Sequence, residues 1–135
     1  PRLLKWQSAH GDIAHRVATS PADAADGADM VITCVGNDDD LADVVLGPQG
    51  VFTMLRRGGV FVDHTTASAE VARELDAAAT KAGFKFVDAP VSGGQAGAQN
   101  GMLTVMCGGD AAAFAAAQPV AQAFARAVTL LGDLS

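Results

Sequence analysis

Three consecutive residues, Ser92, Gly93 and Gly94, have the clearest chemical potential in this sequence. The Ser92 hydroxyl can donate and accept a hydrogen bond, and the two glycines leave backbone N–H groups open to a carboxylate. A glycine-rich turn before an edge strand would contain the same residues, so spacing alone leaves both interpretations open. Residues 93–97 also resemble a phosphate-binding glycine motif. We do not predict such a motif, because a phosphate-binding glycine motif is followed by a helix, and we expect a strand after residues 93–97.

A second candidate is the pair of hydroxyl-bearing residues Thr65 and Thr66, which follows the apolar run 60–63. Their hydroxyls could meet the carboxamide or ribose of a nucleotide, and capping of the next helix is the structural alternative. His64 precedes this pair. We interpret it as a loop residue and not as a general base, because spacing fixes no carboxylate beside it.

The acidic run 38–40 predicts the start of a helix, because negative side chains stabilise the positive end of the helix dipole. No second cluster of ligands completes a metal site, so we predict none. Cys34 and Cys107 each lie in an apolar run. This placement favours buried free thiols in a reducing compartment over a disulfide or a metal site.

The composition restricts the class of protein. A chain of 135 residues, half of them hydrophobic, fits one domain with a real core. The net charge of -6, with scattered basic residues, argues against binding to a nucleic acid backbone. The apolar runs are shorter than the roughly 20 residues of a membrane span, and no secretory signal opens the chain. We therefore expect a cytoplasmic protein, and the first residue, which is not Met, suggests a processed or truncated chain.

Alternating helix and strand signals position the candidate residues. Ser20 predicts an N-cap with Pro21 at the first helical position, and Gly83 predicts the end of the longest helix. Either Thr66 or Ser68 caps that helix. In chain order the predicted elements are a helix end at 3–9, a strand at 16–18, a helix from 21, a strand at 29–35, a helix at 38–46, a strand at 60–63, a helix at 69–82 and a strand at 85–88. This order is typical of parallel βαβ units with right-handed crossovers.

The last third of the chain departs from that order. The strand predicted at 102–107 is reached by a loop, so it can pair antiparallel at a sheet edge. A helix from Asp110, interrupted or restarted at Pro119, precedes a final strand at 127–131. The whole pattern predicts an α/β fold, with a mostly parallel sheet and helices on both faces. Ligands of such sheets bind beyond the carboxyl ends of the strands, here at the three loops 35–40, 64–68 and 89–98.

Several motifs, which follow one another in the family's order, carry a family resemblance. Residues 63–66, Asp-His-Thr-Thr, resemble the D-x-S-T segment of the β-hydroxyacid dehydrogenases, the family of 3-hydroxyisobutyrate dehydrogenase. Residues 88–94 match the D-A-P-V-S-G-G signature of that family, and residues 97–109 resemble its G-A-x-x-G-x-L-T-x-M-x-G-G continuation. The resemblance extends over essentially the whole chain and implies a Rossmann-like domain that binds NAD or NADP.

The resemblance also implies roles for the candidate residues. Ser92 and Gly93, with Gly94 beside them, would hold the carboxylate or hydroxyl of a small 3-hydroxy acid. The cofactor-binding residues implied by the resemblance are Val35, Gly36, Asp40, Thr65 and Thr66. Among these, Thr66 would contact the nicotinamide side, and Val35 with Gly36 the adenosine. Gly36 departs from the proline that is usual in the family, which loosens this loop.

Other parts of the family pattern are not found here. The resemblance implies that the first βαβ unit with its glycine-rich turn precedes Pro1, and that the catalytic Lys and a helical C-terminal domain follow Ser135. Lys81 and Lys85 lie at the wrong end of the sheet to replace that Lys. We therefore expect 1–135 to be a partial NAD(P)-binding domain, without a catalytic residue, from a dehydrogenase that forms a homo-oligomer.

The implied reaction is hydride transfer between a 3-hydroxy acid of 3-hydroxyisobutyrate type and NAD(P). Alternatives are a non-catalytic nucleotide-binding or interaction module, an imine reductase, and a dehydrogenase of a phosphorylated sugar acid. Residues 88–91 favour the branch that acts on short acids. NAD and NADP are not separated, because the segment that distinguishes them precedes Pro1.

Overall fold

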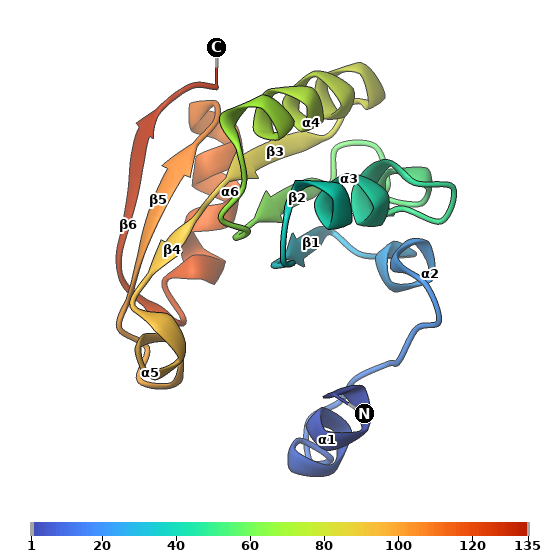
Figure 1. The fold of residues 1–135 in the computed structure, drawn as a ribbon, viewed down its shortest axis with the longest axis vertical. Coiled ribbons are helices and arrows are strands. Elements are labelled where there is room, and N and C mark those ends of the chain that lie inside the picture. Colours follow the sequence, from blue (N-terminus) through green and yellow to red (C-terminus); the bar gives the residue numbers. More distant parts are fainter. Residues whose placement is uncertain (1, 135) are drawn as a thin grey trace.

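The computed structural model describes residues 2–134, which form one mixed sheet with helices against it (Figure 1). The strands of this part of the chain are β1 (Met30–Thr33), β2 (Val60–Asp63), β3 (Lys85–Asp88), β4 (Val91–Ser92), β5 (Leu103–Gly108) and β6 (Ala125–Gly132). The helices are α1 (Arg2–Ala9), α2 (Pro21–Ala25), α3 (Asp38–Leu46), α4 (Ala69–Ala82), α5 (Gly94–Gln99) and α6 (Ala111–Ala121), with a 3₁₀ turn η1 (Val51–Thr53). The predicted α/β class is confirmed.

The first three strands form a parallel, in-register ladder. Thr33 pairs with Asp63, and Asp63 pairs with Asp88, so β1, β2 and β3 end at the same level. The loops that follow these strands therefore start at one edge of the sheet, as the βαβ pattern predicted.

β3 and β4 are two segments of one bent strand. Asp88 lies opposite Gly108, and Val91, three residues later, lies opposite Val105, three residues earlier on β5. Because the antiparallel register with β5 is the same for both segments, Ala89 and Pro90 interrupt the ladder without shifting it. β5 also pairs in parallel with β6, so the prediction that this antiparallel strand lies at a sheet edge is wrong.

Helices cover both faces of the sheet, as predicted. On one face, α3, α4 and η1 enclose a core around Phe61 and Phe86, whose rings stack at 5.6 Å. On the other face, Ala113 and Ala117 of α6 pack against valines of β2, β3 and β5. Alanine has no side chain beyond Cβ, so α6 can lie close to the sheet. The helix α1 lies apart from the sheet in Figure 1.

Pro119 lies inside α6, and the predicted interruption there is wrong. A proline removes one hydrogen-bond donor from a helix and crowds the preceding turn. Here Pro119 is exposed and only two residues from the helix end at Ala121, so the remaining bonds hold the turn together. Asp110 is the N-cap of α6, and its carboxylate accepts hydrogen bonds from two backbone N–H groups at 2.8 Å.

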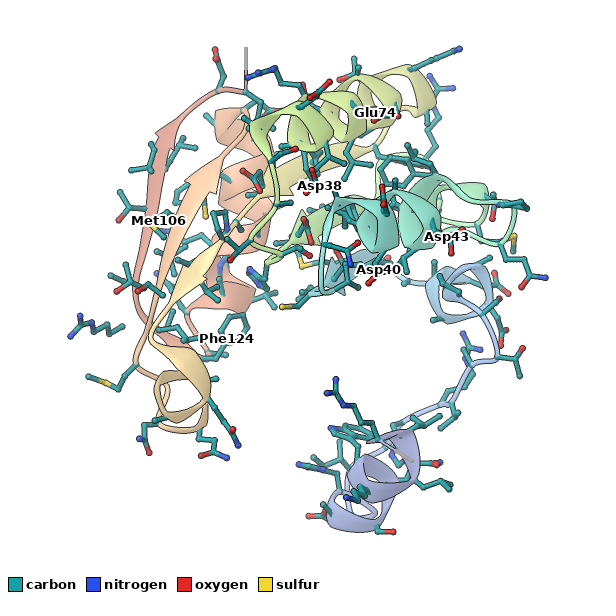
Figure 2. The ribbon with its side chains drawn as sticks, in the orientation of Figure 1. Asp38, Asp40, Asp43, Glu74, Met106 and Phe124 are labelled. Carbon is teal, nitrogen blue, oxygen red and sulfur yellow. The ribbon has the colours of Figure 1, made fainter. Side chains whose placement is uncertain are left out.

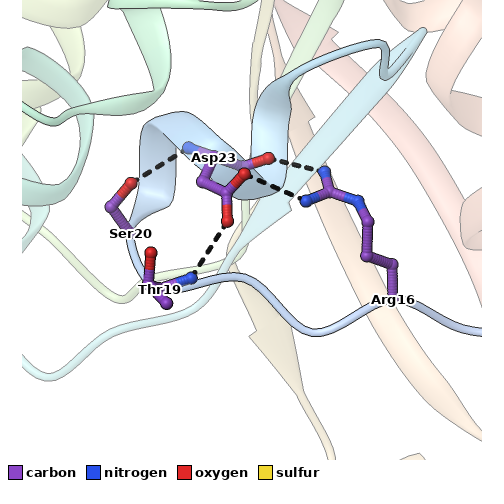
Figure 3. Close-up of polar contacts among 4 residues, drawn as sticks. All are labelled: Arg16, Thr19, Ser20 and Asp23. Atoms are coloured by element: carbon purple, nitrogen blue, oxygen red, sulfur yellow. Dashed lines mark hydrogen bonds and ion pairs between the residues drawn. The ribbon is translucent and has the colours of Figure 1, made fainter.

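Residues 16–18 form no strand, so that prediction is also wrong. A strand needs a neighbour with which to pair, and here side-chain contacts hold the segment instead. Arg16 forms an ion pair with Asp23 at 3.1 Å, and the backbone N–H of Thr19 donates to the same carboxylate (Figure 3). The Ser20 hydroxyl accepts from the Asp23 N–H, which confirms the predicted N-cap of α2.

Two further differences from the sequence-based predictions concern residues near the candidate site. The short helix α5 follows Gly93, where we expected loop and then strand, so the glycine-rich turn at 93–97 leads into a helix. Cys107 is buried as predicted, but Cys34 is exposed because it follows β1 at the sheet end. Both thiols are free.

Candidate functional site

Backbone hydrogen bonds join the three strand ends to one another. The His64 N–H donates to the Thr33 carbonyl at 2.8 Å, and the Ala89 N–H donates to the Asp63 carbonyl at 2.7 Å. Both bonds continue the parallel ladder one step past the strands. The starts of all three loops are therefore fixed relative to one another.

The Asp63 side chain is the centre of a buried polar cluster. Its Oδ1 accepts hydrogen bonds from the Thr33 hydroxyl at 2.8 Å, the Thr65 hydroxyl at 2.6 Å and the Thr65 N–H at 3.1 Å. Asp63 is 1% exposed, and a buried carboxylate needs such donors to offset its lost hydration. The Thr65 hydroxyl accepts in turn from the Val35 N–H at 3.0 Å, which connects the first loop to the second.

Sequence reasoning did not single out Asp63 and Thr33 as residues that shape the site. The available signal was an acidic residue that ends the apolar run 60–62 and begins the D-x-S-T segment. That signal does not say what the carboxylate contacts. Its partner Thr33 lies 30 residues earlier in the chain, so the tertiary pairing of β1 with β2 was needed to identify this contact.

Asp88 is the second carboxylate at this edge. Burial raises the pKa of Asp88 to about 6, and the nearby charge of Asp63 acts in the same direction. Asp88 also lines an open cavity of about 320 Å³, together with Pro90, Met106 and Leu131. The Asp88 carboxyl group on this cavity wall therefore changes its charge at mildly acidic pH.

His64 lies directly after β2, and its ring is buried on the α6 face of the sheet. Its Nδ1 is 2.6 Å from the Ala89 carbonyl oxygen, and the Phe124 ring contacts it edge-on, with the centroids 5.5 Å apart. Its Nε2 is buried and has no hydrogen-bond partner among residues 2–134. A buried polar atom without a partner typically costs about 1–3 kcal/mol.

The predicted cofactor residues lie at the first two loops, with different exposure. Gly36, Asp40 and Thr66 are exposed, Val35 is half-buried, and Thr65 is buried. The Asp40 carboxylate accepts a hydrogen bond from the Asn37 side chain at 3.0 Å. A Cβ atom at position 36 would lie 3.4 Å from an Asp40 carboxylate oxygen. Because Gly36 has no side chain, the backbone beside Asp40 stays accessible.

A further contact ties the same two loops together. The Ser68 N–H donates to Asp38 Oδ1 at 3.0 Å, and hydrogen bonds from Ser68 lower the pKa of Asp38. Figure 2 shows Asp38 and Asp40 projecting from α3. The Ser68 hydroxyl caps α4 by accepting from the Val71 N–H, so Ser68, and not Thr66, is the N-cap. The Thr66 hydroxyl is not used for capping.

The predicted substrate residues Ser92, Gly93 and Gly94 are exposed at the junction of β4 and α5. Gly93 has φ 131° and Gly94 has φ 61°, values that L side chains rarely adopt. The N-cap residue of α5 is Gly93, which has no side chain with which to cap the helix. In the part of the chain that the structure describes, no hydrogen bond joins these three residues to the first two loops; Ala89 makes that connection.

Lys85 begins β3 and Lys81 lies in the last turn of α4, at the opposite end of the strands from this site. Among residues 2–134, no group of three His, Cys, Asp or Glu side chains is arranged to hold a metal ion. No helix of that range is long and apolar enough to cross a membrane.

Comparisons with known proteins identify the family. The family described as the NAD binding domain of 6-phosphogluconate dehydrogenase matches residues 4–132. An uncharacterized oxidoreductase of Shewanella frigidimarina is 53% identical over 133 residues, which cover 98% of this chain and 45% of that protein. Mitochondrial 3-hydroxyisobutyrate dehydrogenase of Rattus norvegicus is 41% identical over 103 residues, 76% of this chain and 31% of that protein.

A solved structure agrees with these matches. The structure of Mycobacterium tuberculosis 3-hydroxyisobutyrate dehydrogenase has a TM-score of 0.80 and 33% identity, over 86% of this chain and 39% of the other. The chain thus spans less than half the length of these relatives. The predicted Rossmann-like fold and the predicted nicotinamide dinucleotide cofactor are confirmed at the level of the family. The chain belongs to the family of NAD-binding domains typified by that of 6-phosphogluconate dehydrogenase.

Proposed function

We propose that the protein containing this chain is an NAD(P)-dependent dehydrogenase that transfers a hydride between a small 3-hydroxy acid and the nicotinamide. One observation carries the proposal: hydrogen bonds through Asp63, Thr65 and Ala89 hold the three loops at the carboxyl ends of β1, β2 and β3. A dinucleotide lying across the first two loops would then have the third loop at a fixed place beside it.

On the cofactor side, we assign direct contact to the backbone of Val35 and Gly36 and to the exposed side chains of Asp40 and Thr66. We assign Thr65 to the same site. Its hydroxyl accepts from the Val35 N–H and donates to Asp63, and these contacts support a role for Thr65 in holding the loops. The exposed glycine and hydroxyl at the strand ends fit a dinucleotide, which needs close backbone approach and hydrogen-bond donors. The nicotinamide supplies the hydride acceptor when bound.

On the substrate side, we assign Ser92, Gly93 and Gly94 to the carboxylate or hydroxyl of the acid. Gly93 and Gly94 are exposed and have no side chain, so a carboxylate can reach their backbone, and the Ser92 hydroxyl adds a donor and an acceptor. The Mycobacterium tuberculosis relative was solved with L-serine, which has a carboxylate and a 3-hydroxyl. We therefore propose an acid of 3-hydroxyisobutyrate type.

Other parts of the proposal concern the whole protein. We propose that residues 1–135 are part of an NAD(P)-binding domain and that the proton-transferring Lys and a helical domain lie beyond Ser135. The chain covers 45% and 31% of the two relatives' lengths, which leaves room for such parts. We further propose a homo-oligomer located in the cytoplasm, where the free thiols of Cys34 and Cys107 stay reduced.

The test is turnover of the full-length protein with a panel of 3-hydroxy acids and either NAD+ or NADP+, followed by nicotinamide absorbance. Ser92→Ala should lower kcat/KM roughly tenfold to hundredfold, the range for loss of a hydrogen bond to a charged group. Ser8→Ala is the matched control, because Ser8 is exposed on α1. Its kcat/KM should stay within about twofold of the parent, since surface changes away from a site have small effects.

The other outcomes of this assay separate the alternatives. Binding of NAD(P) without turnover of any acid would indicate a non-catalytic nucleotide-binding module and contradict the proposal. Turnover of cyclic imines or phosphorylated sugar acids, with none of short 3-hydroxy acids, would contradict the proposed substrate class. An equal loss of activity in the Ser92 and Ser8 variants would remove Ser92 from the site.

A further inference from the structure

We propose that His64 is a positioning residue for the substrate segment: by donating its Nδ1–H to the Ala89 carbonyl, it sets the path of the chain from β3 to Ser92. What this segment binds rests on the proposed function above. The contact itself and its effect on the chain do not, so the two can be tested separately.

The role of the ring follows from its hydrogen bonds. A carbonyl oxygen only accepts, so the 2.6 Å contact requires the hydrogen on Nδ1. Nε2 is buried without a partner, and the whole residue is 8% exposed. The bond to Ala89 is therefore the one hydrogen bond of this ring within the described part of the chain.

The ladder between β2 and β3 shows what this bond replaces. The Lys85 N–H donates to the Gly59 carbonyl, and the Ala89 N–H donates to the Asp63 carbonyl. In a parallel ladder the next bond would run from the Thr65 N–H to the Ala89 carbonyl. The Thr65 N–H instead donates to the Asp63 carboxylate, at 3.1 Å. The His64 side chain thus satisfies the carbonyl that the backbone of β2 no longer serves.

This replacement occurs at Ala89, between the end of β3 and the start of β4. Pro90, the next residue, has no N–H to donate, and its carbonyl accepts from the Met106 N–H at 3.1 Å. Two residues further on lies Ser92. Ala89 is held by Asp63 through its N–H and by His64 through its carbonyl, so His64 fixes the orientation of the peptide that leads into β4. Because His64 also begins the second loop, it couples the cofactor side of the site to the substrate side.

The first test compares three variants of the full-length protein. In His64→Asn, the side-chain amide N–H takes the place of Nδ1–H; in His64→Gln it takes the place of Nε2; in His64→Leu there is no donor. We expect His64→Asn to retain a KM for the 3-hydroxy acid within about threefold of the parent, and the Gln and Leu variants to raise it roughly tenfold or more, since small misplacements of a positioned group are costly.

The KM for NAD(P) should change less than about twofold in all three variants, because none removes a proposed cofactor contact. His15→Leu is the matched control: His15 Nδ1 also contacts a backbone carbonyl, that of Ile13 at 2.7 Å, but in an exposed segment. Equal KM values for the acid in His64→Asn and His64→Gln would overturn the proposal. So would parallel losses for acid and cofactor, which indicate a general structural defect.

A second measurement needs no enzyme activity. Amide hydrogen exchange should accelerate about tenfold at Met106 and Ala89 in His64→Leu and His64→Gln, and not in His64→Asn, while amides of the buried strand β2 stay protected. Protection of Met106 and Ala89 that is equal in all variants would overturn the proposal. If exchange changes as expected but no acid is turned over, His64 positions the segment and the proposed dehydrogenase function is the part that fails.

Discussion

At the scale of single residues, the buried carboxylate of Asp63 organises the site. Three hydrogen-bond donors converge on one of its oxygens, and two of them belong to Thr65. The arrangement explains why a charged side chain ends a strand that is otherwise apolar. The carboxylate holds the second loop and, through the Thr65 hydroxyl, the Val35 N–H of the first loop.

Substitution of Asp63 should therefore reduce stability in a graded way. We expect Asp63→Ala to lower the free energy of unfolding by about 3–5 kcal/mol, because it leaves buried donors without an acceptor. Asp63→Asn should lower it by about 1–2 kcal/mol, because an oxygen acceptor remains. Urea unfolding of the full-length protein measures both. Asp29→Ala is the control: Asp29 pairs with Arg56 on the surface, and such pairs contribute at most about 1 kcal/mol. Equal effects at positions 63 and 29 would contradict this account.

At the scale of elements, small residues decide how closely α6 lies on the sheet. Ala113 and Ala117 are buried against strand valines, whereas Ala115 between them is exposed. The sequence is nearly uniform in alanine here and does not show which face is buried. Packing against β2, β3 and β5 makes that choice.

Enlarging a side chain in this interface should force the helix away from the sheet. We expect Ala117→Leu to lower the free energy of unfolding by about 1–3 kcal/mol, the usual range for overpacking a core. Ala115→Leu should change it by less than about 0.5 kcal/mol, because the side chain points to solvent. Thermal and urea unfolding of the two variants provide the measurement. A larger loss for Ala115→Leu than for Ala117→Leu would mean that the buried face is assigned wrongly.

Local signals at the element scale could be read directly from the sequence. Ser20 with Pro21 marked the start of α2, Gly83 marked the end of α4, and the bounds of β2 and β3 matched the predicted strands 60–63 and 85–88. These signals involve residues within one turn or one strand. The predictions that failed depended on neighbours: a strand at 16–18 requires a pairing partner, and the consequence of Pro119 depends on its exposure near a helix end.

At the scale of the whole molecule, the sheet brings two carboxylates together. Asp63 and Asp88 lie on neighbouring strands at paired positions, and burial together with the Asp63 charge raises the pKa of Asp88 to about 6. A carboxyl whose pKa is higher in the folded state binds its proton more tightly there. Its contribution to stability therefore decreases as the pH rises from about 4 to about 6.

The variant Asp88→Asn should remove this contribution. Between pH 4.5 and pH 7, we expect the parent protein to lose about 1 kcal/mol more stability than the variant; the figure is reduced from the full pKa shift because Asp88 is partly exposed to solvent. Urea unfolding of both proteins at the two pH values gives the difference. A variant whose stability follows the same pH profile as the parent would show that Asp88 does not titrate in this range.

The sequence by itself determined the order of helices and strands from α2 to β3, the parallel arrangement of the first three strands and the three loops at their carboxyl ends. These follow from apolar runs, caps and turn residues, each readable within a short stretch of chain. Only the tertiary structure decided that Asp63 binds Thr33, and that His64 holds Ala89. The partners in those contacts are 30 and 25 residues apart, and pairing of separate strands, which no local pattern encodes, brings them together.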